Sequence, residues 1–393
     1  MQLIFPKYKK KRSNKTVLSH SQQKNSKCKS PRTATNFLCA ALLSLSLPAR
    51  VAHAQAAQIR TTFPNPQPIV SHVIQISVDA MGAKYLEKFL QESPEEFNNF
   101  GRFIKEGATT LNARTDYTHT ITLPNHTSMI TGRPVQTPVE WPEALGHYWT
   151  WNGEVPSTEA PASLHATNPT HGYTATSFDV AHDNGLTTAL YSGKTKFALF
   201  TISDGPELGA ENPRGRNKVD FSEIGNGVHA KALASLKAHH PGYTFLHYPD
   251  PDAAGHAYGY LGPEYRNAVK AVNGYLGDLF NLVTTDPEWK ERTIIILSAD
   301  HGGKPGTKNH ADATDPYDYT IPFLVWGHAI PKGVDLYTLN SVTRINPGEG
   351  RPLYGPTGQP IRNGDGGNLV LKLLGLPAIP GSHINNKQDL YVR

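Results

Sequence analysis

Alternating strand-like and helix-like segments restrict the fold of this 393-residue chain more than any other feature. The segments rich in β-branched and aromatic residues, as strands are, cover 72–81, 187–197, 242–252, 292–303 and 320–327. Amphipathic patterns at 83–92 and 266–283 predict helices between them. The run TIIIL at 293–297 is almost wholly apolar, which is typical of a parallel strand covered on both faces. We therefore predict a doubly wound α/β fold, with helices on both faces of a mostly parallel central sheet, as a single domain over 65–393.

Two stretches interrupt this alternation and are predicted to be loop insertions. Residues 133–177 are rich in Pro, Gly, Trp and Tyr and hold Trp141, Trp149 and Trp151. Residues 341–367 are rich in Gly, Pro and Asn. Loops of this length are usually functional or disordered. The tryptophans of the first insertion could form a small hydrophobic cluster, or a wall that stacks on a flat part of a ligand.

Acidic and imidazole side chains follow three of the predicted strands. They are Asp79, then Asp252 with His256, then Asp300 with His301, and His310 follows nine residues after His301. Because the carboxyl ends of parallel strands line the ligand crevice of an open α/β sheet, we expect these side chains to converge. Carboxylates and imidazoles without a thiolate suit Zn²⁺, with Mn²⁺ as a second choice. Each residue alone would also fit a helix cap, a surface pair or a turn.

The segment TLPNHTSMITG at 122–132 places Thr122 at the expected start of a helix. Pro124 has its φ fixed for a first helical turn, and Asn125 or Thr122 could cap the helix. The amides of a helix N-terminus also attract anions, so Thr122 could instead be a nucleophile presented there. A nearby Zn²⁺ would lower the pKa of its hydroxyl, and no histidine base would be needed.

The order of these motifs resembles the alkaline phosphatase superfamily, and most closely its type I phosphodiesterase/nucleotide pyrophosphatase branch. The likeness covers nearly the whole chain after its first residues. It rests on Asp79, on Thr-x-Pro-Asn-His from 122, on Pro-Asp-x-x-Gly-His at 251–256, on Ala-Asp-His-Gly-Gly at 299–303 and on a later histidine. The resemblance implies two zinc ions. It places Asp79, Thr122, Asp300 and His301 on one, and Asp252, His256 and a further histidine on the other.

The further histidine is either His310 or His383. In the nucleotide pyrophosphatases this ligand comes much later in the chain than residue 310. The late candidate His383, in GSHINNK, follows the last predicted helix and lies outside the expected motif. We predict His310, whose short spacing resembles the phosphomutase and phosphoethanolamine-transferase branches. The resemblance also implies that Asn152 contacts the phosphoryl oxygen.

The function implied by the resemblance is metal-dependent hydrolysis of phosphodiester or pyrophosphate bonds through a phosphothreonine at Thr122. The alternative is phosphomonoester hydrolysis, for which Lys194 or Lys196 could balance the additional charge. Sulfatase activity is disfavoured because the Cys/Ser-x-Pro-x-Arg element is absent. A non-catalytic zinc-binding protein is a further alternative, but such a protein would be expected to have lost the nucleophile or some ligands.

Residues 1–54 are predicted to be a signal peptide with a long basic n-region, and the product is expected in the periplasm or secreted. They hold eleven Lys/Arg and no acid, an apolar run at 36–49, and an A-x-A site at Ala52 and Ala54. An uncleaved membrane anchor is the alternative, although no later run is long enough to span a bilayer. Removing the eleven charges from the net +5 leaves −6, which argues against nucleic-acid binding by charge. The expected partner is a small phosphate ester.

Overall fold

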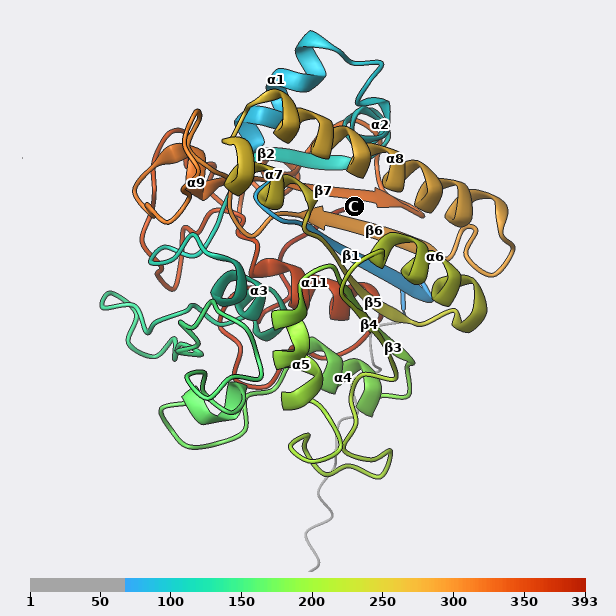
Figure 1. The fold of residues 1–393 in the computed structure, drawn as a ribbon. Helices are drawn as coiled ribbons and strands as arrows, with labels where there is room; N and C mark the ends of the chain where they lie inside the picture. Colours follow the sequence, from blue (N-terminus) through green and yellow to red (C-terminus); the bar gives the residue numbers. More distant parts are fainter. Residues whose placement is uncertain (1–67) are drawn as a thin grey trace, which may run out of the picture. The chain divides into compact units, whose positions relative to one another are not determined.

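An eight-stranded sheet forms the centre of the computed structural model, which describes residues 68–393, and its strand order is β4-β3-β5-β1-β6-β7-β2-β8 (Figure 1). The strands are β1 His72–Val78, β2 Ala108–Arg114, β3 Thr188–Ser192, β4 Phe221–Ile224, β5 Tyr243–Tyr248, β6 Thr293–Ser298, β7 Thr320–Gly327 and β8 Val334–Asp335. All neighbouring pairs are parallel except those that β7 makes with β6 and β2. The predicted α/β fold with a mostly parallel sheet is therefore confirmed.

Helices cover both faces of this sheet. They are α1 Ala83–Glu92, α2 Asn98–Glu106, α3 Thr122–Thr131, α4 Ser177–Asp183, α5 Ala198–Ser203, α6 Val228–His239, α7 Asp250–Tyr258, α8 Pro263–Thr285, α9 Pro316–Tyr319, α10 Leu336–Leu339 and α11 Asp365–Leu373. Helices α2, α6 and α8 gather on one face, and α3, α4 and α11 on the other (Figure 1). Helix α8 buries Val269, Val272, Leu276 and Leu279, whose spacing of three and four residues forms one apolar stripe.

The central strands are buried from end to end, as their sequences require. Every residue of β1, β5 and β6 is buried. Because burying an aliphatic side chain contributes about 1.5–3 kcal/mol to stability, these three strands form the hydrophobic centre of the domain. Their carboxyl ends emerge at one edge of the sheet, because β5, β1 and β6 are parallel neighbours.

The reversed direction of β7 determines where the connection after β6 must lie. An antiparallel neighbour of β6 has to begin at the edge where β6 ends, and β7 pairs with β6 in this way. Residues 299–319 therefore stay at the carboxyl edge of the sheet. This connection contains His301 and His310.

The two predicted insertions have little regular structure. Between 133 and 176 the structure has only the short 3-10 helix Leu164–Thr167, and 341–364 has no helix and no named strand. Strands β2, β4 and β8 were not among the predicted ones. The predicted signal peptide lies outside the described residues. Over residues 68–393, no helix combines the length and the apolar character needed to cross a membrane.

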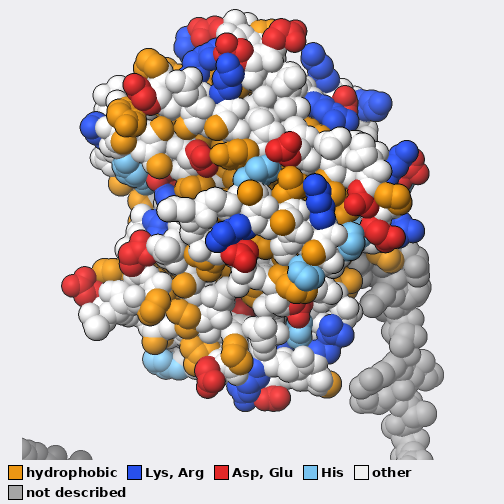
Figure 2. Space-filling view, turned by 45° about the vertical axis from the view of Figure 1, so that its right-hand side comes forward, with side chains coloured by type: hydrophobic (Ala, Val, Ile, Leu, Met, Phe, Trp, Pro, Cys, Tyr) orange, Lys and Arg blue, Asp and Glu red, His pale blue; other side chains and the backbone are white. Residues whose placement is uncertain are grey.

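Charges are mixed on the face that Figure 2 shows. Acidic and basic side chains alternate over it, and neither sign forms a large patch.

Candidate active site

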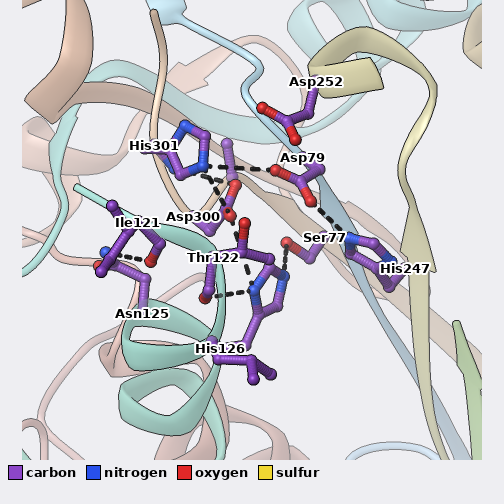
Figure 3. Close-up of polar contacts among 12 residues, drawn as sticks. Ser77, Asp79, Ile121, Thr122, Asn125, His126, His247, Asp252, Asp300 and His301 are labelled. Carbon is purple, nitrogen blue, oxygen red and sulfur yellow. Dashed lines mark hydrogen bonds and ion pairs between the residues drawn. The ribbon is translucent and has the colours of Figure 1, made fainter. Parts of the chain in front are cut away.

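The acidic residues meet at the carboxyl edge because each follows one of three adjacent strands. Asp79 comes directly after β1, Asp300 lies two residues after β6, and Asp252 is in the first turn of α7 after β5. The close-up shows their carboxylates pointing toward one another and toward His301 (Figure 3). Local sequence thus places the acids, and the parallel pairing of the strands brings them together.

Three donor atoms at this edge are buried without a hydrogen-bond partner in the described part of the chain. They are Asp79 Oδ1, Asp300 Oδ2 and His301 Nε2. His301 Nε2 lies 3.4 Å from Asp79 Oδ1 and 3.2 Å from Asp300 Oδ2. Unpartnered polar atoms are costly in a protein interior. Their convergence within 4.8 Å of one another fits a metal ion, and this set is the first candidate metal site.

A second set of donors adjoins the first and shares His301 with it. Asp252, His301 and His310 offer ligand atoms that also lie within 4.8 Å of one another. His310 Nε2 is 3.7 Å from Asp252 Oδ1, and His256 Nε2 is 3.4 Å from the same oxygen. The two imidazole nitrogens of His310 and His256 are 3.2 Å apart. All the predicted metal ligands therefore fall in one region.

The histidines of both sets present the same ring nitrogen to the centre. Their Nδ1 atoms face backbone carbonyls: His301 faces Gly302 at 2.8 Å, His310 faces Thr120 at 2.6 Å, and His256 faces Lys308 at 3.0 Å. An Nδ1–H that donates to a carbonyl leaves Nε2 free for a metal. Burial, followed by the neighbouring His310, lowers the pKa of His301 to about 3, and burial lowers the pKa of His310. Neutral imidazoles and carboxylates are the donor set of Zn²⁺.

Two glycines of the sequence motifs let the chain fold this tightly. A Cβ at Gly302 would lie 2.0 Å from the carbonyl oxygen of Tyr317, and one at Gly255 would lie 2.1 Å from the ring of Tyr260. Tyr260 in turn donates to Asp252 Oδ1 at 2.8 Å. These glycines therefore allow the contacts that orient the ligands.

Lys194 lies among the carboxylates, with its Nζ 2.6 Å from Asp79 Oδ2 and 2.5 Å from Asp252 Oδ2. Burial alone would raise the pKa of Asp79, yet Lys194 and His247 lower it well below its usual range. Burial also opposes the charge of Lys194, but Asp79 and Asp252 raise its pKa. Burial and the charge of Asp79 raise the pKa of Asp300 well above its usual range.

Thr122 is the first residue of α3 and faces this site (Figure 3). Neither Thr122 nor Asn125 caps the helix, because the N-cap is Ile121 and no side chain accepts there. Asn125 instead accepts from the amide of Asp116 at 2.9 Å and donates to the carbonyl of His119. The helix start is held by His126, whose Nδ1 faces the carbonyl of Thr122 and whose Nε2 faces Ser77 Oγ, both at 2.8 Å.

Asn152 reaches the helix start from the first insertion. Its Oδ1 accepts from the amide of Leu123 at 2.9 Å and from Lys196 Nζ at 3.1 Å. A cleft of about 490 Å³ opens here, and Thr122, Asn152, Lys194 and Lys196 are among its lining residues. Asn152 thus lies between the candidate nucleophile and a second lysine.

His383 lies apart from these residues. Its ring packs edge-on against Trp141 with 5.7 Å between centroids, and it lines a different hollow together with Arg344. Of the two alternatives for the last ligand, the structure brings only His310 to the acidic residues.

Sequence reasoning missed the residues that orient the ligands. His247 faces Asp79 Oδ2 at 3.0 Å, and its other nitrogen is 3.0 Å from Ser192 Oγ. A signal was available, because a histidine within the otherwise buried strand YTFLHY needs polar partners. The sequence suggests for Lys194 only a charge that could balance a phosphomonoester substrate. Its contact with both carboxylates depends on the pairing of β3 with β5.

The sequence matches one family in particular. A model of the type I phosphodiesterase/nucleotide pyrophosphatase family matches residues 73–137 and 142–353. No curated protein matches the chain.

Several solved structures share the fold. A murine ectonucleotide pyrophosphatase/phosphodiesterase 5, solved as an inactive variant with AMP, has a TM-score of 0.55 at 15% identity, covering 81% of this chain and 99% of its own. The human protein of the same name has a TM-score of 0.53 at 14% identity, with coverage of 81% and 99%. An alkaline phosphatase superfamily protein from Vibrio parahaemolyticus has a TM-score of 0.51 at 17% identity, covering 82% of this chain and 72% of its own.

Proposed function

This chain belongs to the type I phosphodiesterase/nucleotide pyrophosphatase family and is a hydrolase, and from that premise we propose that it cleaves small phosphate esters at a two-zinc site through Thr122. The observation that carries the proposal is the convergence of Asp79 Oδ1, Asp300 Oδ2 and His301 Nε2 at the helix start that presents Thr122. None of these three atoms has a hydrogen-bond partner among the residues that the structure describes. Asp79, Thr122, Asp300 and His301 would hold one ion, and Asp252, His256 and His310 the other. The ions, when bound, would lower the pKa of the nucleophile and neutralise charge on the phosphoryl group.

Thr122 attacks phosphorus in this mechanism. A bond forms between Thr122 Oγ1 and phosphorus, the ester oxygen leaves and takes up a proton, and water then hydrolyses the phosphothreonine. The hydroxyl is well placed because His126 fixes the first turn of α3 against β1 through Ser77. Such positioning is a major part of catalysis in phosphoryl transfer.

Asn152 and Lys196 supply hydrogen-bond donors and charge for the phosphoryl oxygens. Asn152 Oδ1 accepts from the Leu123 amide and from Lys196 Nζ, so its amide N–H groups would be the donors offered to a phosphoryl oxygen. Burial, followed by the charge of Lys194, lowers the pKa of Lys196. An anionic substrate would relieve the mutual repulsion of the two lysines.

Phosphomonoester hydrolysis is a second candidate, and the two lysines favour it. Lys194 Nζ is 3.5 Å from Thr122 Oγ1, and Lys196 contacts Asn152 and no carboxylate within the described residues. Two cations near the nucleophile would suit a phosphoryl group with two negative charges. The AMP bound by the murine neighbour supports nucleotide esters among the substrates to test.

The test compares turnover of bis-p-nitrophenyl phosphate and p-nitrophenyl phosphate, before and after a chelator removes divalent ions. We expect faster turnover of the diester, loss of activity with the chelator, and recovery with Zn²⁺. Elemental analysis should find close to two divalent ions per chain. Activity in a preparation without divalent metal would contradict the proposal, and a preference for the monoester would favour the second candidate.

Export is proposed from the leader alone. Its residues 1–54 join a basic region to an apolar run and an A-x-A site. Cleavage after Ala54 would give a product that begins at Gln55. Amino-terminal sequencing of the protein from a periplasmic or culture-medium fraction checks this, and an intact leader there would contradict it.

A further inference from the structure

Lys194 bridges two carboxylates that we assign to two different metal ions. Its Nζ is 2.6 Å from Asp79 Oδ2 and 2.5 Å from Asp252 Oδ2. Both carboxylates are buried, whereas 20% of the Lys194 side chain is exposed on the side of the cleft. The cation at the centre of the acidic site is thus part of the chain itself.

The ammonium and the divalent ions would share the same two carboxylates through different oxygens. Lys194 Nζ contacts Oδ2 of Asp79 and of Asp252, whereas Oδ1 of each carboxylate faces the metal-binding histidines. Asp79 belongs to one set of donor atoms and Asp252 to the other, so each ion would be bound by a carboxylate that Nζ also contacts. Like charges at such separations repel strongly in a buried site of low dielectric. Metal binding therefore opposes this position of the Lys194 ammonium.

The side chain of Lys194 can leave while its backbone stays fixed. Ser192 Oγ accepts from the amide of Lys194 at 3.1 Å and donates to its carbonyl at 3.2 Å. The same oxygen is 3.0 Å from His247 Nδ1, which ties this turn to the site. The four-carbon stem of a lysine rotates freely, and here it borders the cleft of about 490 Å³ that it shares with Glu154. Rotation of the stem is enough to carry the ammonium from the carboxylates into the cleft.

We propose that Lys194 is a built-in counter-ion that neutralises Asp79 and Asp252 until divalent ions bind these carboxylates, when charge repulsion moves its ammonium into the cleft beside Thr122. Two buried carboxylates without a cation would destabilise the fold, and Lys194 provides that cation before the metal arrives. In its second position the ammonium meets the anionic substrate. The inference rests on the proposed function, from which it takes the two-metal site.

The test compares Lys194→Met with Lys196→Met, two variants in the same cleft. Lys196 is the matched control, because within residues 68–393 its Nζ contacts only Asn152 Oδ1 and the Asn152 carbonyl, each at 3.1 Å. Chelator-treated proteins are titrated with Zn²⁺ against a chromophoric chelator, and Tm is recorded with and without Zn²⁺. We expect Lys194→Met to bind Zn²⁺ about tenfold or more tightly than the parent protein, because no cation has to be displaced.

The Tm values provide a second readout that does not depend on turnover. Without metal, Lys194→Met should melt below the parent protein, and the rise in Tm that Zn²⁺ causes should be larger. Lys196→Met should keep the Zn²⁺ affinity of the parent within about threefold.

Equal or weaker Zn²⁺ binding by Lys194→Met would overturn the counter-ion role. If the metal-free variant does not fold, the zinc-loaded variant and the zinc-loaded parent are exposed to excess chelator instead. Slower loss of Zn²⁺ from the variant than from the parent supports the counter-ion role. Equal or faster loss overturns it. A parent protein that binds no divalent ion would overturn the proposed function itself. A parent that binds two ions, with no gain in the variant, overturns only the inference about Lys194.

Discussion

Four histidines of this site fall into two groups. Two of them turn one ring nitrogen toward the carboxylates, and the other two use both ring nitrogens to hold neighbouring groups in place. His301 and His310 place Nδ1 on a backbone carbonyl and turn Nε2 toward the carboxylates. His126 and His247 use both nitrogens, His126 on Thr122 and Ser77, His247 on Asp79 and Ser192. The first pair leaves Nε2 facing the carboxylates, and the second pair holds the start of α3 and the carboxylate of Asp79.

The role of Thr122 can be tested with two substitutions. Thr122→Ala should abolish turnover, because it removes the attacking oxygen, and the Tm should change by no more than about 2 °C, since the hydroxyl contributes little to the core. Thr122→Ser should retain part of the activity. Diester turnover and thermal melts of the three proteins check this. Near-parental turnover of the alanine variant would point to direct attack by water.

The last metal ligand can be tested by comparing two histidines. His310→Ala should lower the occupancy of one metal site, because His310 Nε2 is 3.7 Å from Asp252 Oδ1. The turnover rate should fall by orders of magnitude. His383→Ala should change neither, since its ring packs against Trp141. Elemental analysis of both variants gives the answer. Metal loss confined to His383→Ala would assign the site to the later histidine.

Asp318 should make stability depend on pH near neutrality. Its carboxylate is buried and accepts from the amide of Asp312 at 3.1 Å, and burial, followed by the charge of Asp315, raises its pKa to about 7. In the unfolded chain an aspartate has a pKa of about 3.9, so the folded state loses stability as pH rises from about 4 through 7. Asp318→Asn should remove this loss. Its Tm advantage over the parent should grow between pH 5 and pH 8, and a constant offset would contradict the expectation.

At the scale of elements, connections at the edge of the sheet build the site as much as the strands do. The segment 299–319 returns to β7 on the side where β6 ends, and so brings His310 to the carbonyl of Thr120. The insertion 133–177 contributes Asn152, which reaches the amide of Leu123. Both segments are irregular, and both are held to the site by hydrogen bonds to the start of α3 or the residues before it.

The aromatic residues of the insertion differ in burial, and one of the two earlier interpretations is wrong for Trp149. Trp149 is fully buried in the core and cannot stack on a ligand, whereas Trp151 is partly exposed and donates to the carbonyl of Glu154 at 3.2 Å. Trp149→Ala should cost about 3–5 kcal/mol and lower Tm by roughly 5–10 °C.

Trp151→Ala is the matched control for Trp149→Ala. It should shift Tm by less than about 2 °C, because its ring is only partly buried. Thermal melts compare the two variants, and kinetics with a nucleotide diester and a small alkyl diester show whether Trp151 contacts substrate. Equal loss of stability in both variants would show that the exposed ring is also structural.

At the scale of the whole molecule, a buried arginine joins the second insertion to the start of α11 and to the last residues of the chain. Arg344, in the second insertion, lies 2.9 Å from Asp365 at the start of α11 and 2.8 Å from Asp389 near the end of the chain. It also donates to Asn385 at 3.1 Å. The insertion at 341–367 is therefore anchored to the body of the domain.

Arg344→Met should destabilise the protein by about 3–5 kcal/mol, because it leaves Asp365 buried without a cation. Arg216→Met is the control, since Arg216 pairs with Glu211 on an exposed surface, where an ion pair contributes at most about 1 kcal/mol. Urea unfolding midpoints measure both. Similar small shifts in the two variants would show that the segments are held by other contacts.

The amino-acid sequence by itself determined the class of fold and most of the acidic site. The buried strands around Ile76, Phe245 and Ile296 are encoded by short apolar runs, and Asp79, Asp252 and Asp300 stand just after them. The apolar runs and the acidic residues that follow them are both local signals, because each can be read from a few consecutive residues. Adjacent parallel strands then place such residues together in any fold of this kind.

Three features came only from the tertiary structure: it brought His310 and not His383 to the acidic residues, it placed Trp149 in the core, and it placed Lys194 between two carboxylates. Each of these features depends on contacts between residues far apart in the chain. His310 is placed by the connection 299–319 against the segment before α3, Trp149 by the packing of the first insertion against the core, and Lys194 by the turn after β3 against the first turn of α7. Such contacts leave no periodic pattern in the sequence, because they are set by the direction of β7, the order of the strands and the packing of irregular segments.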